Sequence, residues 1–431
     1  MCVASHQSCD ALPQILCISG DQMSIDSGSG GQVAIVGCGP SGCYTALAVR
    51  RLAPAAHITV FDARPTPYGL VRYGVAPDHQ GMKNVSKQFD RLFAAERVDF
   101  VGNTRVGQDV PLSALENNFD VVVVATGLPE DRRLSVPIDP RARVLGAGQL
   151  LRLLNGDPDS TLRRAGLPAP LGAEVVMVGA GNVAMDVARL LCKRDDGFDG
   201  SDVDDDARLA LNTAGLRRIT VLSRSTRERV RWDAAMFTEL CALPGVAVHL
   251  DGRLATSRIP DDTGVCVDIR FNEQVTRIDA DGEYAVVHTG PSSSDGSGTS
   301  DNRSQGSTYR AHSVITAMGF VAPSREPGWT ATSDRVLFVG GCSSGVLGNL
   351  AENRALAKAA AADIVAVLSH EQGRPGLIGV RDQCCAATSF DDWLVVDRAE
   401  VAQARPNRLR SKFTAWEAIS DVIAEHRHRR L

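Results

Sequence analysis

The chain has 431 residues, of which 44% are apolar and 23% are charged, and its formal net charge is −5. This length allows two or three domains that each bury a core, and the composition is that of an ordinary globular protein. The mild charge gives no reason to expect a nucleic-acid or membrane partner. No run reaches the roughly eighteen apolar residues that a membrane-spanning helix needs.

Residues 1–30 contain neither Lys nor Arg. A signal peptide begins with basic residues and a transit peptide is rich in Arg, so we expect neither and predict a cytoplasmic protein. The Ser- and Gly-rich run at 24–31 is interpreted as a flexible lead into the first domain.

The first predicted unit is a strand, a glycine-rich loop, a helix and a second strand. The apolar run 32–36 precedes GCGPSG at 37–42, a helix is predicted over 43–52, and the strand 57–61 ends at Asp62. This order is typical of a dinucleotide-binding βαβ unit. The glycines allow a tight turn and a close approach of the pyrophosphate to the helix N-terminus, and the acid accepts hydrogen bonds from a ribose.

A continuous apolar strand follows in the run FDVVVVATGLP, and it ends at Thr126 and Gly127. A second βαβ unit then begins with the strand 174–178 and the loop GAGNVA at 179–184. Its helix is predicted over 185–193.

The next predicted strand, at 218–222, is followed by Arg224 rather than by an acid. A positive residue there suits a ribose 2′-phosphate, so NADP is favoured over NAD. Three more arginines, at 227, 229 and 231, add charge nearby. The alternative is a solvated arginine-rich loop beside an ordinary NAD site.

Two segments have low complexity, the acidic run at 196–206 and the Ser- and Gly-rich run at 290–308. Both are predicted to be solvated loops. Further along, a strand near 335–339, a glycine-rich loop and an Ala-rich helix form a third strand–loop–helix pattern.

The eleven cysteines contain no CxxC pattern and no Cys/His spacing typical of zinc, so we expect no metal site. Cys38 and Cys43 fall in the first glycine-rich loop, where a redox role would compete with cofactor binding. We interpret the cysteines as buried free thiols in a reducing compartment. A thiol–disulfide reductase is disfavoured because we expect no close cysteine pair.

Two dinucleotide loops in one chain suggest that one dinucleotide stays bound while the other exchanges. A resident FAD and a transient nicotinamide, stacked between two domains, would pass a hydride from nicotinamide C4 to flavin N5. The cofactors carry this chemistry and the protein orients them. Such a reaction needs no Ser/His/Asp or Cys/His constellation, and none is evident.

The run TPYGLVRYGVAPDHQGMKNV at 66–85 resembles a motif of the adrenodoxin reductase family, the NADPH-dependent ferredoxin reductases that serve iron–sulfur proteins. The similarity continues at 102–110, in the second loop, and in FDDWLVVDRAE and RSKFT near the C-terminus. It covers roughly 31–415, and the motif at 69–79 is far more selective than a glycine pattern.

We expect two Rossmann-like domains of α/β class, with the NADP domain inserted in a discontinuous FAD domain, because the run VVVVATG leads out of the FAD domain and RVLFVGG leads back into it. We expect a lead at 1–30, FAD-binding parts at 31–127 and 320–431, and an NADP-binding domain at 128–319. His79 matches a histidine placed near the flavin in a proton relay. It could equally be a histidine that only hydrogen-bonds a loop.

Together with the glycine patterns, the resemblance implies further residues at the two cofactors. The FAD set is Gly37, Gly39, Ser41, Gly42, Asp62, Leu70, Val106, Thr126, Gly127, Gly341, Gly345, Val346 and Leu347. The NADP set is Gly179, Gly181, Asn182, Val183, Arg224 and Glu239.

Two departures from the family pattern leave the electron acceptor open. The loop VGGCSSGVLGN at 339–349 lacks the family's Trp and Pro and is shorter, and Ser225 stands where a second arginine is usual. One hypothesis is transfer to a ferredoxin-type iron–sulfur protein, docked on Arg405, Arg408, Arg410 and Lys412 or on the basic tail. The alternatives are a small organic molecule, a quinone or oxygen as acceptor, or a regulatory flavoprotein with little turnover.

Overall fold

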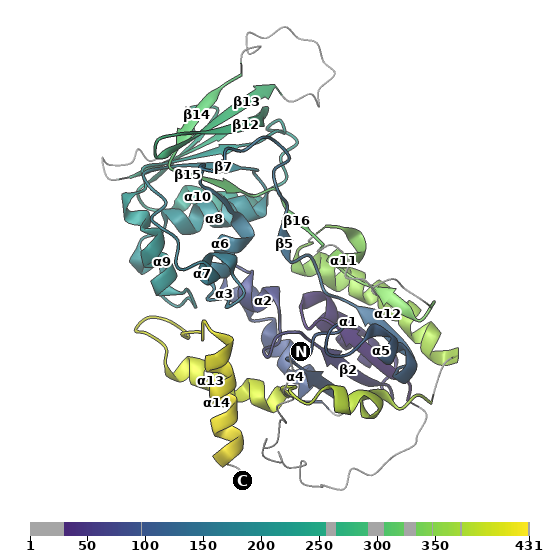
Figure 1. The fold of residues 1–431 in the computed structure, drawn as a ribbon. Coiled ribbons are helices and arrows are strands. Elements are labelled where there is room, and N and C mark those ends of the chain that lie inside the picture. The colour runs from purple at the N-terminus through teal and green to yellow at the C-terminus, as the bar shows by residue number, and fades with distance from the viewer. Residues whose placement is uncertain are drawn as a thin grey trace, which may run out of the picture.

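The computed structural model describes residues 30–429 except 96, 256–263, 292–305, 323–332, 347 and 371–372. Two lobes lie side by side, and each is built on a parallel sheet (Figure 1). The predicted α/β class is therefore confirmed. Among the described residues, no helix combines the length and the apolarity that crossing a bilayer requires.

The first lobe holds a five-stranded parallel sheet in the order β17-β4-β1-β2-β3. Its strands are β1 (Gln32–Val36), β2 (His57–Phe61), β3 (Val98–Val101), β4 (Val121–Val124) and β17 (Val336–Phe338). Val33 and Ile35 of β1 pack with α1 (Pro40–Leu52) and α12 (Leu350–His370). Ala34 and Val36 pack with α5 (Leu112–Asn118) and the 3-10 helix η3 (Gly376–Gln383). Burial on both faces explains why these strands are mostly apolar.

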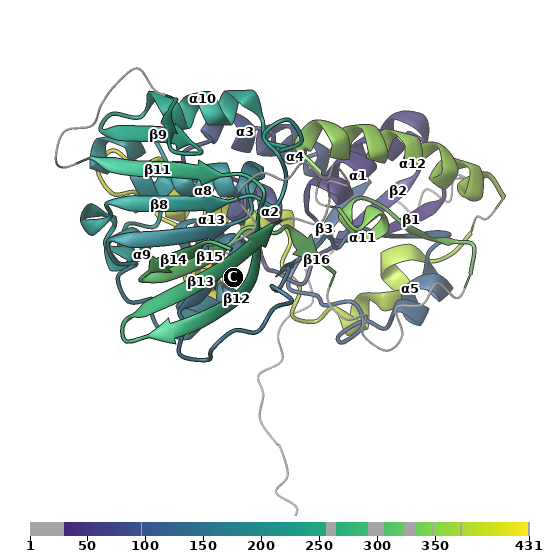
Figure 2. The ribbon, with the colours of Figure 1, turned by 90° about the horizontal axis from the view of Figure 1, so that it is seen from above.

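The second lobe holds a seven-stranded sheet in the order β10-β9-β11-β8-β7-β15-β6, parallel except at its β10 edge. One face is covered by helices and the other by a three-stranded antiparallel sheet (Figure 2). The strands are β6 (Val144–Gly146), β7 (Glu174–Val178), β8 (Arg218–Leu222), β9 (Val246–Leu250), β10 (Arg253–Leu254), β11 (Val265–Arg270) and β15 (Ser313–Thr316). The covering elements are α6 (Ala147–Leu154), α8 (Asn182–Cys192), α9 (Asp205–Leu211), α10 (Ala234–Ala242), β12 (Glu273–Asp281), β13 (Tyr284–Pro291) and β14 (Thr308–Ala311).

The chain leaves the first lobe after β4 and returns before β17. At this crossing β5 (Glu130–Asp131) pairs antiparallel with β16 (Phe320–Val321), between the lobes (Figure 1). The remaining helices are α2 (Leu70–Tyr73), α3 (Gln80–Lys83), α4 (Ser86–Phe93), α7 (Thr161–Arg164), η1 (Asp195–Phe198), η2 (Thr213–Gly215), α11 (Gly341–Ser344), α13 (Phe390–Ala402) and α14 (Trp416–Arg429). Both C-terminal helices add apolar side chains to the core of the first lobe.

The prediction that residues 196–206 form a solvated loop is wrong. The run forms η1 and the start of α9, and Ser201, Asp202 and Val203 between them are at most 5% exposed. Acidic composition suggested solvation, but basic side chains from distant segments neutralise these carboxylates. Residues 292–305 of the other predicted loop and residues 1–29 of the predicted lead lie outside the described residues.

Candidate active site

The first glycine-rich loop follows β1, the strand at which the order of the first sheet reverses. The chain runs outward through β2 and β3 on one side, and β4 lies on the other side of β1. Ligands of open α/β sheets bind at such a reversal, beyond the carboxyl ends of the strands. The second loop follows β7, which lies between β8 and β15 and occupies the equivalent position in its own sheet.

Two glycines of the first loop are required by the protein itself. Gly37 has φ of 111°, and a Cβ there would lie 2.6 Å from the carbonyl oxygen of Ala125. A Cβ on Gly42 would lie 1.9 Å from the carbonyl oxygen of Gly37, so helix and loop pack closely only with glycine.

Gly39 differs, because a Cβ there would meet no protein atom within 4 Å. It is the N-cap of α1, so its open side adjoins the unpaired N–H groups of a 13-residue helix. Gly181 repeats this arrangement at the N-cap of α8, where the nearest atom to an added Cβ is 3.9 Å away. Both loops therefore border open space at a helix N-terminus, the kind of place where phosphates bind.

The second loop has the same backbone geometry as the first. Gly179 has φ of 108°, and its N–H donates to Leu222 as that of Gly37 donates to Phe61. The N-cap dihedrals also match, with φ −80° and ψ −175° at Gly39 and φ −88° and ψ −173° at Gly181. Asn182 accepts a hydrogen bond of 2.7 Å from the backbone N–H of Asp233, which ties the 224–233 segment to this loop.

Asp62 lies at the end of β2 beside the first loop. Its two carboxylate oxygens accept hydrogen bonds from the backbone N–H groups of Cys38, at 2.7 Å, and Arg64, at 2.9 Å. Burial raises the pKa of Asp62, and these two hydrogen bonds oppose the shift. The carboxylate is therefore fixed in orientation next to the loop.

The 66–79 motif packs directly against the first loop. Tyr68 donates its backbone N–H to the carbonyl of Cys38 at 2.8 Å, and both Tyr68 and Gly69 have positive φ. A Cβ on Gly69 would lie 3.1 Å from the Cα of Gly39, which explains the glycine. Leu70 begins α2 directly after this contact. Val106 is buried in the core between the first sheet and α5.

The 339–349 loop returns to the same place from far along the chain. A Cβ on Gly340 would lie 2.1 Å from the Oγ of Ser41, and that hydroxyl donates to Asn353 at 2.8 Å. A cavity of about 350 Å³ opens here, lined by Gly341, Ser344, Val346, Gly348, Glu352 and Asn353. Thr126 and Gly127 follow β4 at this edge, Gly345 ends α11, and Leu347 lies outside the described residues.

His79 lies between two carboxylates of the second lobe. Its Nε2 is 3.1 Å from Glu239 of α10, and its Nδ1 is 3.4 Å from Asp186 of α8. Burial raises the pKa of Asp186, although His79 and Arg189 oppose the shift. The structure thus brings together two predicted residues, His79 and Glu239, that are 160 positions apart.

Sequence reasoning missed the charged residues around His79. Arg189 is nearly buried and pairs with Asp78, Asp186 and Glu239, and Lys193 also pairs with Asp78. Burial alone would raise the pKa of Asp78, but Arg189 and Lys193 lower it to about 2. The signal that was available is the presence of Asp186 and Arg189, three residues apart, in a helix that is otherwise mostly apolar.

The arginine-rich segment after β8 is exposed. Arg224, Arg227 and Arg231 all have solvent-exposed side chains, and the backbone of Arg231 passes nearest to Gly181. Val183 lies in the first turn of α8. The segment therefore passes beside the second loop, and it carries these exposed arginines.

The predicted docking patch at 405–412 is wrong for Lys412, whose side chain is only 3% exposed and pairs with Asp202. Arg405, Arg408 and Arg410 each pair with a carboxylate, Asp206, Asp205 and Asp397 respectively. Only Arg405 is half exposed. These residues are largely neutralised within the chain, so they do not form a free basic surface.

The eight cysteines in the described part of the chain are free thiols. The expectation that there is no close pair is wrong, because the Sγ atoms of Cys38 and Cys43 are 3.7 Å apart. Both residues are fully buried, and burial raises the pKa of the Cys38 thiol. Within the described residues, no cluster of His, Cys, Asp or Glu is suited to a metal.

Comparisons with known proteins agree with this geometry. Residues 31–335 match the model of the pyridine nucleotide-disulphide oxidoreductase family. The chain is 44% identical over 219 residues to cindoxin reductase of Citrobacter braakii, and 38% over 218 residues to the mitochondrial NADPH:adrenodoxin oxidoreductase of Arabidopsis thaliana. Each match covers 51% of this chain, and 46% and 45% of those proteins. The chain thus spans about half the length of the curated relatives it matches.

A solved structure, Mycobacterium tuberculosis FprA in complex with NADPH, has the same fold with a TM-score of 0.81. The match is 24% identical and covers 92% of this chain and all of FprA. The resemblance to adrenodoxin reductases is confirmed by the names of the sequence relatives. The chain therefore belongs to the pyridine nucleotide-disulphide oxidoreductase family.

Proposed function

We propose that this chain is a flavoprotein reductase that takes a hydride from NADPH and passes electrons to a ferredoxin-type iron–sulfur protein. The observation that carries the proposal is the pair of loops with matching N-cap dihedrals, in which Gly39 and Gly181 both border open space at a helix N-terminus. The names of the relatives, cindoxin reductase and NADPH:adrenodoxin oxidoreductase, support the reaction.

We assign FAD to the first lobe, residues 31–127 and 320–431, and NADP to residues 128–319. In the first lobe, Asp62 would accept from the ribose and the N–H groups after Gly39 would bind the pyrophosphate. FAD, when bound, supplies the chemistry of accepting a hydride and releasing electrons singly. The remaining proposed contacts are Gly37, Ser41, Gly42, Leu70, Val106, Thr126, Gly127, Gly341, Gly345 and Val346 for FAD, and Gly179, Gly181, Asn182, Val183 and Glu239 for NADP.

We further propose that Arg224 binds the 2′-phosphate and that His79 holds a proton at Nε2, where it meets Glu239. The exposed arginines after β8 support the first assignment. The position of the imidazole between two carboxylates supports the second, because a carboxylate oxygen accepts a hydrogen bond from an imidazole N–H. A cytoplasmic location is part of the proposal, since the free thiols suit a reducing compartment.

A small organic acceptor is the second candidate. The 350 Å³ cavity beside the shortened 339–349 loop favours such an acceptor. Val346, which lines the cavity, is 66% exposed and offers an apolar contact. An acceptor entering there would reach the first loop without a protein partner.

Anaerobic stopped-flow mixing with NADPH, followed by an oxidised ferredoxin, tests the proposal. We expect the flavin absorption to bleach and then to recover as the ferredoxin is reduced. Bleaching without recovery would overturn the iron–sulfur acceptor, and a quinone could then be tried in its place. A flavin that NADPH does not bleach would overturn the reductase and leave the regulatory flavoprotein.

A further inference from the structure

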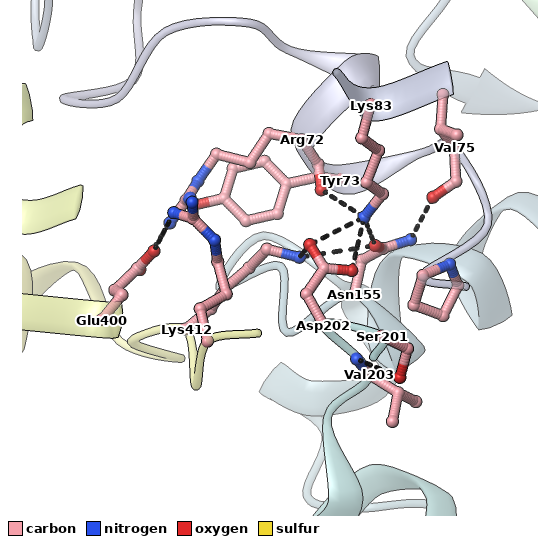
Figure 3. Close-up of polar contacts among 12 residues, drawn as sticks. Arg72, Tyr73, Val75, Lys83, Asn155, Ser201, Asp202, Val203, Glu400 and Lys412 are labelled. Carbon is pink, nitrogen blue, oxygen red and sulfur yellow. Dashed lines mark hydrogen bonds and ion pairs between the residues drawn. The ribbon is translucent and has the colours of Figure 1, made fainter. Parts of the chain in front are cut away.

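Three distant segments of the chain meet at the buried carboxylate of Asp202 (Figure 3). Lys83, at the end of α3, donates to its two oxygens at 2.7 and 2.9 Å, and Lys412 contacts Oδ2 at 2.6 Å. The three side chains are between 3% and 8% exposed. No role follows for this cluster from the dinucleotide loops.

Asn155 strengthens the link between the lobes. Its Oδ1 accepts from Lys83 at 2.5 Å, and its Nδ2 donates to the carbonyl of Val75 at 2.9 Å. The backbone N–H of Asp202 also donates to the carbonyl of Pro77 at 3.1 Å. Asn155 and Asp202 of the second lobe therefore hydrogen-bond residues on both sides of His79. Val75 and Pro77 precede it, and Lys83 follows it.

The position of His79 explains why this matters. His79 is the N-cap of α3, and Lys83 is the last residue of that four-residue helix. The ring of His79 touches Glu239 and Asp186 at one end, while Asp202 and Asn155 hold Lys83 at the other. A helix this short has little rigidity of its own, so its two ends are fixed by the second lobe.

The charge balance of the cluster is unusual, with two ammonium groups facing one carboxylate. Burial lowers the pKa of both Lys83 and Lys412, against the attraction of Asp202. Burial alone would raise the pKa of Asp202, but the two lysines hold it below its usual range. Removal of Asp202 would leave two buried ammonium groups without a counter-charge, whereas removal of one lysine leaves a balanced pair.

We propose that Asp202, acting through Lys83, is a positioning residue that fixes α3 and thereby the placement of His79 between the lobes. The inference rests on the proposed function for its kinetic consequence only. The contacts of Lys83 with Asp202 and Asn155 are features of the structure and do not depend on the proposed reaction.

The test compares Lys83→Met with Lys412→Met. Both remove one ammonium group and leave a balanced pair, but only Lys83→Met frees the end of α3. In flavin-loaded protein at saturating NADPH, we expect Lys83→Met and Asp202→Asn to lower the limiting rate of flavin reduction about tenfold or more. Lys412→Met should stay within about threefold, and the Kd for NADPH should change little in all three.

Asp206→Asn is a surface control, because Asp206 is 63% exposed and pairs with the half-exposed Arg405. Equal rates in Lys83→Met and Lys412→Met, or a lowered melting temperature with an unchanged rate in Lys83→Met, would overturn the positioning role.

Amide hydrogen exchange provides an arm that does not depend on activity. Exchange over residues 77–84 should rise in Lys83→Met and not in Lys412→Met or Asp206→Asn. If NADPH fails to reduce the unmodified protein, the proposed reaction is wrong. The exchange rates of the variants still test whether Lys83 fixes α3. Unchanged exchange over 77–84 in Lys83→Met would refute it.

Discussion

The glycines of the first loop serve two different purposes, one in the fold and one in ligand binding. Gly37 and Gly42 are demanded by contacts within the chain, whereas Gly39 borders empty space. A side chain at Gly39 should therefore leave the fold intact and block only the ligand.

Gly39→Glu is expected to abolish FAD retention, because the side chain fills the pyrophosphate space and adds like charge. Gly215→Glu is a matched control, because a Cβ at Gly215 also meets no atom within 4 Å. Gly215 belongs to neither glycine-rich loop. The ratio of flavin to protein absorbance and the melting temperature check this. A yellow Gly39→Glu protein would contradict the assignment.

Arg224→Ala is expected to raise the KM for NADPH and to leave NADH use nearly unchanged. A lost charged hydrogen bond to phosphate costs about 1.5–3 kcal/mol, which is about one to two factors of ten in affinity. Steady-state kinetics with both nucleotides measures this, with Arg227→Ala as the neighbouring comparison. Equal use of the two nucleotides by the unmodified protein would refute the role of Arg224.

Among the helices and strands, both βαβ units and their loops could be predicted, because apolar runs next to glycine patterns are local signals. The strands at 32–36, 57–61, 174–178 and 218–222 lie as predicted. The acidic run at 196–206 could not be interpreted correctly, because its partners Lys83 and Lys412 are more than a hundred residues away on either side. The same distance hid the pairing of Arg408 with Asp205.

A nearly buried ion pair between Arg189 and Asp78 ties helix α8 to the 66–79 motif. Because of this pair, we expect the free energy of unfolding to fall at acid pH. Asp78 has a folded-state pKa of about 2, below its usual value of 3.8. Its contribution, about 2 kcal/mol, is present above pH 4 and is lost as the pH falls through the folded-state pKa.

Asp78→Asn should therefore lower the free energy of unfolding at pH 7 and flatten its decline between about pH 4 and pH 2. Urea unfolding at several pH values measures both. Asp139→Asn is the comparison, because the pKa of Asp139 is also about 2 but its partner Arg141 is 75% exposed. A pH profile of Asp78→Asn that parallels the unmodified protein would contradict this interpretation.

For the whole molecule, the two lobes place their loops at equivalent reversals of strand order, and His79 bridges them through Glu239 and Asp186. Sequence patterns predicted the residues of each loop but not this contact, because the approach of two lobes depends on packing between distant segments. The loop at 339–349 likewise reaches Ser41 only through the fold.

The visible absorption spectrum of the purified protein, recorded before and after anaerobic addition of NADPH, tests whether the two loops hold a flavin and a pyridine nucleotide that react. We predict a yellow protein whose flavin bands bleach on mixing. A colourless protein that cannot be reconstituted with FAD, or a flavin that NADPH leaves oxidised, would contradict it.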